Sequence, residues 1–205
     1  MSIKAIISDI GNVLLNFDHH TITKRLANYS LYPEDRIYNI IIEKGTHNDY
    51  DKGLISSNEF YQRVKDRIKA NIDFEDFANI WKHMFYKTED SKKLKNLLIK
   101  LKKSKNLKIG VLSNINELHY QEVTRIIGKM AFADFITLSY EIHSVKPEKG
   151  IYQNALTGLK IRAEECIYMD DIKEYAEAAS RIGIIGIHYT GYDNFVKELK
   201  ELKVL

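Results

Sequence analysis

The sequence predicts an α/β protein with a Rossmann-like parallel-sheet core and an inserted helical cap. Five short apolar runs, most of them rich in isoleucine or valine and without strict alternation, are typical of strands buried on both faces. Segments with helical spacing separate most of these runs, as expected for a parallel sheet. The stretch 19–86 shows no evident strand. A block of helices is therefore expected directly after the first strand.

The expected core comprises residues 1–16 and 88–205, and the expected cap comprises residues 17–87. The expected strands of the core cover residues 3–8, 107–112, 135–138, 166–169 and 184–188. Its expected helices cover residues 92–103, 117–127, 147–159, 172–182 and 194–202. In the first of these helices four leucines fall on one stripe, and the lysines between them form a solvated face.

The cap should contain about four helices. The first covers residues 20–29, and Pro33 opens the second at its first helical position. Ser56 begins a capping box for the third helix, and Asp73 can cap the fourth.

Two further features of the cap bear on function. Phe77, Trp81 and Phe85 recur at helical spacing, and we interpret them as the core of the cap. The polar stretch 46–53 lies between two helices. It is either an ordinary connection or a loop that closes over the site and selects the substrate.

Composition excludes several classes of function. The 205 residues carry a net charge of +3, and the charges are mixed along the chain, so no nucleic-acid partner is expected. No apolar run is long enough to span a membrane, and no signal peptide is evident, so a cytoplasmic protein without a membrane partner is predicted. The single cysteine, Cys166, leaves no disulfide within the chain and is expected to be a buried, inert thiol.

Polar side chains follow four of the expected strands. In open α/β sheets, ligands bind at the carboxyl ends of the strands. Each residue taken alone can be explained as a helix cap or turn residue. Together they place carboxylates, a lysine and a hydroxyl at one sheet edge, which indicates a site. The residues are Asp9, Ser113, Asn114, Lys146, Asp170 and Asp171.

This set of residues favours phosphate chemistry. Clustered carboxylates repel one another and need a cation, and oxygen ligands suit Mg²⁺. Lys146 can neutralise charge and hold a phosphate, while Ser113 and backbone N–H groups can donate to its oxygens. A carboxylate such as Asp9 can attack phosphorus and form an aspartyl-phosphate. The sequence therefore predicts Mg²⁺-dependent phosphoryl transfer from a small phosphorylated molecule.

The order of these motifs resembles the haloacid dehalogenase-like hydrolase superfamily over essentially the whole chain. Four pieces carry the resemblance: SDIGNV, VLSNIN, SVKPEKGIY, and CIYMDD with the following AEAASRIGI. Within the superfamily, GNV, the SN-x-N-x-x-H spacing and KPE-x-x-IY are similar to the bacterial α-D-glucose-1-phosphate phosphatase group. The long helical block resembles the family's helical cap.

The resemblance implies a role for each site residue that handles phosphate. Asp9 would be the nucleophile. Ser113 and Asn114 would bind the transferring phosphoryl group, and Lys146 would neutralise Asp9 and the phosphate.

The resemblance also implies a Mg²⁺ site. Asp171 and Asp9 would be ligands, together with the main-chain carbonyl of Gly11, two residues after the nucleophile. Asp170 would orient Lys146 or assist the metal.

The chain departs from the family pattern at two positions. Most family phosphatases have an aspartate where this chain has Gly11, and that aspartate protonates the leaving oxygen and then activates water. Its loss removes general acid–base help, typically worth about 10²–10⁴-fold. The site should therefore prefer phosphates with good leaving groups, such as anomeric sugar phosphates, aryl phosphates or acyl phosphates. Tyr175 replaces an asparagine common in related loops and should affect only a bond at the periphery of the site.

A replacement acid or base could come from the start of the cap. We hypothesise that Asp18 or His19 reaches the site. We favour the alternative that Asp18 caps the first cap helix, with His19 and His20 on its exposed first turn.

Two other functions compete with a phosphatase. A non-catalytic phosphate-binding or regulatory protein could have lost activity with its second aspartate, but retention of Asp9, Lys146 and Asp171 argues against it. A 2-haloacid dehalogenase also uses an aspartate nucleophile, but it needs no Mg²⁺ and normally carries an aromatic residue near the position of Gly11.

Overall fold

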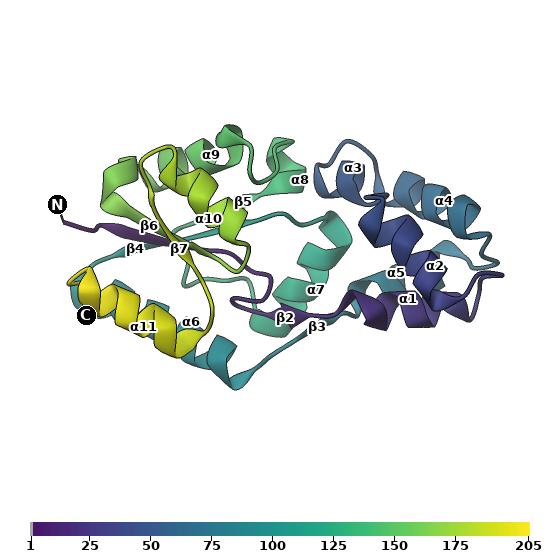
Figure 1. The fold of residues 1–205 in the computed structure, drawn as a ribbon, viewed down its shortest axis with the longest axis horizontal. Helices are drawn as coiled ribbons and strands as arrows, with labels where there is room; N and C mark the ends of the chain where they lie inside the picture. The colour runs from purple at the N-terminus through teal and green to yellow at the C-terminus, as the bar shows by residue number, and fades with distance from the viewer. Residues whose placement is uncertain (1) are drawn as a thin grey trace.

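The computed structural model describes residues 2–205 and has a parallel five-stranded sheet at its centre (Figure 1). The strand order is β5-β4-β1-β6-β7. The strands are β1 (Ala5–Ser8), β4 (Lys108–Ser113), β5 (Phe135–Leu138), β6 (Cys166–Asp170) and β7 (Ile185–His188). Ala5 of the central strand pairs with Lys108 on one side and Cys166 on the other. The predicted fold class is confirmed, and each predicted strand agrees to within two residues at its ends.

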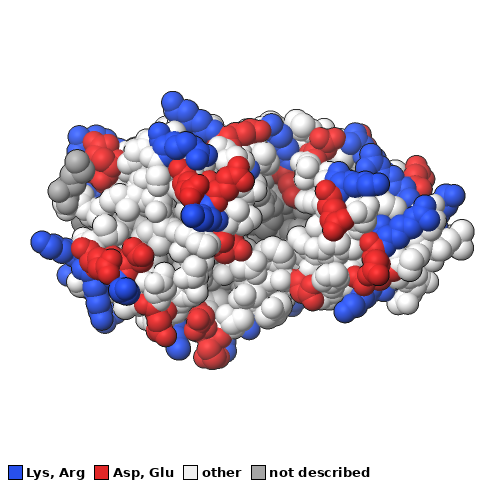
Figure 2. Space-filling view, in the orientation of Figure 1, with Lys and Arg blue, Asp and Glu red and all other residues white. Residues whose placement is uncertain are grey.

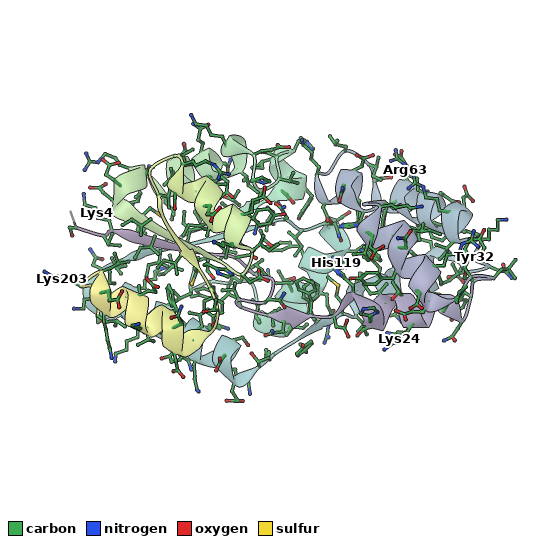
Figure 3. All side chains as sticks on the ribbon, viewed as in Figure 1. Lys4, Lys24, Tyr32, Arg63, His119 and Lys203 are labelled. Atoms are coloured by element: carbon green, nitrogen blue, oxygen red, sulfur yellow. The ribbon has the colours of Figure 1, made fainter. Side chains whose placement is uncertain are left out.

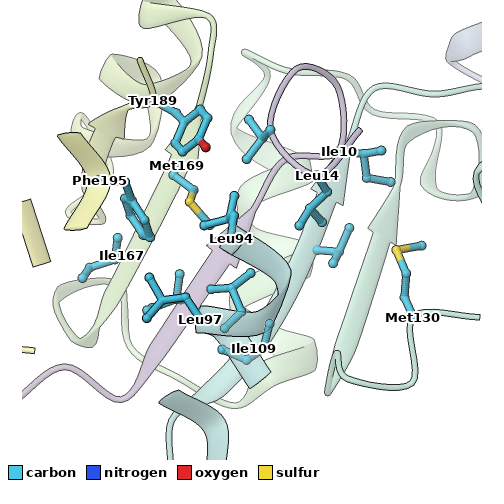
Figure 4. Close-up of a cluster of buried hydrophobic side chains, with 14 of the residues drawn as sticks. Ile10, Leu14, Leu94, Leu97, Ile109, Met130, Ile167, Met169, Tyr189 and Phe195 are labelled. Carbon is cyan, nitrogen blue, oxygen red and sulfur yellow. The ribbon is translucent and has the colours of Figure 1, made fainter. Parts of the chain in front are cut away.

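Helices cover both faces of this sheet because successive strand residues point to opposite sides. Ile6 belongs to a buried cluster with α6 (Glu89–Lys105), α7 (Glu117–Ile127) and α11 (Tyr192–Glu201). Figure 4 shows part of that cluster, with Leu94 and Leu97 facing Ile109 and Ile167. Ile7 belongs to the cluster on the other face, with α9 (Lys149–Leu159) and α10 (Lys173–Ser180). Burial on both faces explains why the strands lack polar alternation.

The helices between residues 19 and 82 form an insert beside the sheet, and its hydrophobic core is closed by Leu118 of α7. Its helices are α1 (His19–Ala27), α2 (Glu34–Tyr38), the π-helix η1 (Asn39–Glu43), α3 (Asn48–Asp51), α4 (Ser57–Ile68) and α5 (Phe74–Lys82). Phe77 and Trp81 belong to its buried core, as predicted. Phe85 does not lie on the same helix; it is half-buried and packs against both this core and that of the sheet.

A two-stranded antiparallel sheet connects the insert to the core. It pairs β2 (Asn16–Phe17) with β3 (Phe85–Tyr86), so the chain enters and leaves the insert side by side. Strands of two residues are too short to show a periodic pattern, and the sequence did not indicate them. The domain boundaries at residues 17 and 87 stay a prediction; they fall next to this small sheet.

The helix starts of the insert follow local capping rules with two corrections. The side chains of Ser56 and Asp73 accept hydrogen bonds from the backbone of Glu59 and Asp76, as predicted for N-caps. The capping box predicted at Ser56 is only half formed, because the Glu59 carboxylate pairs with Arg63. Pro33 is not the first helical residue. Its extended backbone makes it the N-cap, and the helix begins at Glu34.

The polar stretch 46–53 is not a plain loop, because it contains the single helical turn α3. The turn is bounded by Gly45 and Gly53, both with positive φ. Two further short helices that the sequence did not indicate are α8 (Ser139–Ile142) and the 3₁₀ turn η2 (Ala163–Glu165). Within residues 2–205, none of the helices has the length and apolar character that crossing a membrane requires.

Candidate active site

The sheet brings the predicted residues to one edge. Asp9 follows β1 directly, and its backbone N–H donates to Met169 of β6 at 3.0 Å. Ser113 ends β4 and Asp170 ends β6. All three side chains are buried, although each is polar. Buried polar side chains at converging strand ends indicate a built site rather than a solvated loop.

Lys146, in the connection between α8 and α9, contacts two of the carboxylates. Its Nζ lies 2.9 Å from Asp9 Oδ1 and 2.7 Å from Asp170 Oδ2. Burial lowers the pKa of Lys146, but the carboxylates of Asp9 and Asp170 outweigh it and raise that pKa above the ordinary value. The ammonium also lies 5.0 Å from the ring centroid of Tyr175, so this residue contributes a cation–π contact.

Asn114 holds the backbone of Lys146 in place. Its Oδ1 accepts from the Lys146 N–H at 2.7 Å, and its Nδ2 donates to the Lys146 carbonyl at 3.2 Å. Both ends of the Asn114 amide are thus engaged. The phosphate contact of Asn114 stays a prediction, and the sequence could not indicate where the side chain points.

Three carboxylates converge beside the lysine. Oxygens of Asp9, Asp170 and Asp171 lie within 4.8 Å of one another. Asp170 is fully engaged: one oxygen accepts from Lys146 and from the Tyr168 hydroxyl, and the other accepts from the Ile172 backbone at 2.8 Å. This arrangement fits a residue that orients Lys146.

Asp171 is bound less completely. Its Oδ2 accepts from Asn12 Nδ2 at 3.0 Å, and its carboxylate lines a cavity together with Asp9. Burial raises the pKa of Asp171 above the ordinary value.

The charges around Asp9 fit a bound cation. Burial raises the pKa of Asp9 to about 7; Lys146 opposes this shift, and Asp170 and Asp171 add to it. Asp9 Oδ1 is buried and has no hydrogen-bond donor within residues 2–205, although Lys146 stands at ion-pair distance. A carboxylate cluster with an unsatisfied buried oxygen and only oxygen donors fits a Mg²⁺ ion.

The space beside Gly11 is filled by an aromatic ring. A Cβ built at this position would lie 2.8 Å from Phe17 Cε1 and 3.8 Å from Asp9 Oδ2. A contact of 2.8 Å is shorter than carbon atoms tolerate. The Phe17 ring therefore occupies the space that a side chain at position 11 would need.

A cavity of about 450 Å³ opens between the sheet edge and the helical insert. Figure 2 shows a hollow between these two parts of the molecule, on a surface of mixed charge. The core contributes the floor, and the insert contributes a wall of polar and aromatic side chains. The lining includes Asp9, Gly11, Ser113, Lys146 and Asp171 below, and Phe17, His19, His47, Asp49, Asp51, Lys52 and Trp81 above.

Comparison with known proteins decides the family. The family described as haloacid dehalogenase-like hydrolase matches residues 22–188. The chain belongs to that family. The match begins after Asp9, so the assignment is independent of the first motif.

Relatives of this hydrolase cover nearly its whole length. It is 23% identical to the sesquiterpene phosphatase astK of Aspergillus oryzae over 97% of this chain and 96% of that one. It is 22% identical to D-ribitol-5-phosphate phosphatase of Bacteroides thetaiotaomicron over 82% of this chain and 83% of that one.

Solved structures share the fold of this hydrolase. A predicted HAD-like hydrolase of Porphyromonas gingivalis has a TM-score of 0.80 at 18% identity, covering 99% and 98% of the two chains. A HAD family enzyme of Bacteroides thetaiotaomicron has a TM-score of 0.75 at 23% identity, covering 89% and 92%. The latter was solved as an aspartate-to-alanine variant with magnesium and inorganic phosphate.

The start of the insert behaves only in part as expected. Asp18 is exposed and caps α1, accepting from the His20 backbone at 2.9 Å. His20 is exposed and bonds to Glu34 at 2.6 Å. His19 was expected on an exposed first turn, but it is half-buried and lines the cavity of the hydrolase. Its ring packs against that of Phe17, with 4.9 Å between centroids, and this contact turns it toward the site.

A polar network joins the hydrolase core to the insert and was not predicted as a contact. Asn116 caps α7, accepting from the His119 backbone at 3.0 Å, and its Nδ2 donates to Asp51 Oδ1 at 2.7 Å. His119 Nε2 contacts the Trp81 carbonyl at 2.9 Å, and the two rings stack. Burial lowers the pKa of His119 to about 3, so the ring is neutral.

Figure 3 places His119 where the helical insert meets the core. Both Asn116 and His119 belong to the SN-x-N-x-x-H spacing of the sequence. That spacing could have drawn attention to both residues. In the structure they bond to Asp51 and to the Trp81 backbone and so join the insert to the core.

Proposed function

We propose that the chain is a Mg²⁺-dependent phosphatase that hydrolyses a small phosphorylated metabolite through an aspartyl-phosphate on Asp9. One observation carries the proposal. The buried Lys146 ammonium lies between Asp9 and Asp170, with the carboxylate of Asp171 beside them at the sheet edge. A nucleophilic carboxylate, a phosphate-neutralising cation and oxygen ligands for a metal are the parts that phosphoryl transfer needs.

The groups that contact phosphate have three different roles. A carboxylate oxygen of Asp9 attacks phosphorus, and the leaving oxygen departs with the electrons of the broken bond. Lys146 offsets the negative charge of the nucleophile and the phosphoryl oxygens. The Ser113 hydroxyl and the Asn114 backbone N–H donate to those oxygens from the end of β4.

Asp9, Asp171 and the carbonyl of Gly11 would hold the metal, and Asp170 orients Lys146 while lying next to the metal ligands. A bound Mg²⁺ supplies charge neutralisation for the phosphoryl oxygens. We propose further that residues 17–87 act as a cap, because the cavity lies between this insert and the site.

The proposed substrate class rests on Gly11 and on the cavity rather than on the relatives, because D-ribitol 5-phosphate carries its phosphate on a primary alcohol. The two relatives named above are a sesquiterpene phosphatase and a D-ribitol-5-phosphate phosphatase. Since position 11 offers no acid, we propose that the substrate has a good leaving group. An anomeric sugar phosphate satisfies this condition and is of a size suited to a cavity of about 450 Å³.

An activity assay tests the proposal. Purified protein is given para-nitrophenyl phosphate and a panel of sugar phosphates, with and without Mg²⁺, beside Asp9→Asn. We expect turnover that needs both Mg²⁺ and Asp9, with sugar 1-phosphates ahead of sugar phosphates on primary alcohols. Mg²⁺ binding without turnover of any substrate would instead indicate a regulatory protein. Metal-independent release of halide from 2-haloacids would indicate a dehalogenase.

A further inference from the structure

The cavity contains a side chain that the phosphatase proposal leaves unused. We propose that His19, from the helical insert, is the general base that activates water in the second half of the reaction. It would take the place of the carboxylate that Gly11 lacks. The inference rests on the proposed phosphatase function and assigns one of its residues.

The carboxylates near the site are committed elsewhere. Asp170 is bonded through both oxygens, and Asp171 is bound to Asn12 and belongs to the metal set. Asp18 is exposed and caps α1, and it does not line the cavity. Asp49 and Asp51 do line it, but each already has partners.

The partners of the two insert carboxylates are firm. Asp49 is paired with Arg63 at 2.7 Å. Asp51 accepts from Asn116 at 2.7 Å and lies 3.6 Å from His47. These bonds tie Asp49 to α4 and Asp51 to the start of α7, whereas no bond of this kind holds the His19 ring among residues 2–205.

Three histidines line the cavity, and their hydrogen bonds separate them. His47 uses Nδ1 on the Ile41 carbonyl at 2.9 Å and points Nε2 toward Asp51. His119 uses both ring nitrogens, on Asn116 and on the Trp81 backbone. Neither ring nitrogen of His19 has a hydrogen-bond partner within residues 2–205. His19 is therefore the histidine free to bind water.

Phe17 explains how His19 reaches the right place. Its ring fills the space beside Gly11 and packs against the His19 ring. The aromatic ring that excludes a carboxylate at position 11 thus packs against an imidazole that lines the same cavity as Asp9. Phe17 pairs with Phe85 in the small sheet of β2 and β3, and this pairing holds its backbone in place.

The protonation state favours a base over an acid. Burial lowers the pKa of His19 to about 4; His47 and His20 lower it further, and Asp18 opposes them. Lys146, Asp9 and Asp171 also face the cavity from the core. A neutral imidazole accepts a proton and does not donate one, so the leaving group must still depart without acid help. The preference for good leaving groups is retained.

The step balances as follows. The water oxygen forms a bond to phosphorus as the bond between phosphorus and the Asp9 carboxylate oxygen breaks. The electron pair of the broken bond restores the Asp9 carboxylate. One water proton moves to the His19 imidazole and then to the released phosphate or to solvent.

Transient kinetics with para-nitrophenyl phosphate and Mg²⁺ tests the assignment. In His19→Gln and His19→Ala we expect the first nitrophenolate to appear as a burst equal to the enzyme concentration. Steady turnover should fall by about 10²-fold, the low end for the loss of base help, because an imidazole with a pKa of about 4 is a weak base. Acid quenching should trap a phosphoenzyme that accumulates in these variants, and added imidazole should restore part of the turnover of His19→Ala.

His20→Gln is the matched control, because His20 is the next residue but is exposed and bonded to Glu34. It should keep normal turnover, and all variants should keep their thermal melting profile. Turnover of His19→Gln within about threefold of the parent, or slow turnover without a trapped phosphoenzyme, would refute the assignment while leaving the phosphatase intact. A parent protein that forms neither product nor phosphoenzyme would overturn both proposals.

Discussion

The buried Lys146 is the residue on which the charge balance of the site depends. Its ammonium contacts Asp9 and Asp170, and its backbone is held at both polar groups by Asn114. A buried cation between two carboxylates is stable only if it stays fixed, because a displaced partner leaves an unpaired charge. The clamp by Asn114 therefore protects the alignment of the nucleophile as well as the loop that carries the lysine.

Restoring an aspartate at Gly11 should damage the protein. The new Cβ would lie 2.8 Å from Phe17, so the ring must shift from its contacts with His19 and Phe85. We expect Gly11→Asp to lower the free energy of unfolding by about 1–3 kcal/mol and to give no gain in turnover. Urea denaturation and the para-nitrophenyl phosphate assay measure the two effects.

A second substitution distinguishes crowding from charge in that experiment. Adding Phe17→Ala to Gly11→Asp removes the ring and should relieve the overlap, though not the loss of packing. If Gly11→Asp alone were as stable as the parent and faster, Phe17 would not be the obstacle that the distance indicates.

At the scale of elements, the N-terminus of α7 is the joint between sheet and insert. Asn116 caps this helix and also donates to Asp51 of α3, while Trp81 of α5 lies within 3.4 Å of its side chain. One side chain thus supports three elements. The joint also explains why the stretch 46–53 is ordered as a turn.

Replacing Asn116 should cost more stability than replacing an ordinary cap. Loss of an N-cap costs about 0.5–2 kcal/mol. Asn116→Ala also leaves the half-buried Asp51 carboxylate without its donor, which adds about 1 kcal/mol. Asp73→Ala, the cap of α5, is the matched control because its side chain serves only its own helix.

Urea unfolding followed by the fluorescence of Trp81, the single tryptophan, reports on both variants. Equal losses in the two variants would show that the bond to Asp51 adds nothing to the cap.

For the whole molecule, the buried His119 and the half-buried His19 should make the fold acid-sensitive. The folded-state pKa values of His119 and His19 are lowered to about 3 and about 4, below the ordinary 6.5. Their contribution is present above pH 6.5 and is lost as the pH falls toward the folded-state values, because the unfolded chain binds the protons first. Asp9 acts in the opposite sense, since its raised pKa makes the folded chain hold a proton up to about pH 7.

The test uses Asp9→Asn as the background, which removes the opposing carboxyl whose pKa is raised to about 7; Asp51 and Asp171, whose pKa values are also raised, are the same in every variant compared. The free energy of unfolding should fall between pH 6.5 and 4 by up to about 1.4 kcal/mol per pH unit for each histidine. Adding His119→Gln should flatten the slope, whereas adding His20→Gln, at an exposed position, should not. A slope unchanged by His119→Gln would contradict the prediction, because it would mean that the pKa of His119 is the same in the folded and unfolded chains.

Much of the fold and of the site's composition can be predicted from sequence because both depend on local patterns. Apolar runs such as the one ending at Ser8 mark strands buried on both faces, and the polar residues that follow them share an edge in any parallel sheet. The side-chain directions at that edge depend on contacts far apart in sequence. Asn114 turns to the backbone of Lys146, 32 residues away, and His19 is directed by packing on Phe17. No periodic pattern records either contact.

The central position of β1 sets the order in which the protein can fold. Its partners are strands that begin at Lys108 and Cys166, so the segment carrying the nucleophile leaves the ribosome long before either partner exists. At about 5–20 residues per second, the strand waits several seconds at least for β6. The helical insert, with mostly local contacts, can form meanwhile. Strand β1 is thus paired on both sides only after β6 has been made, and an exposed Ala-Ile-Ile run is what a nascent-chain chaperone would meet.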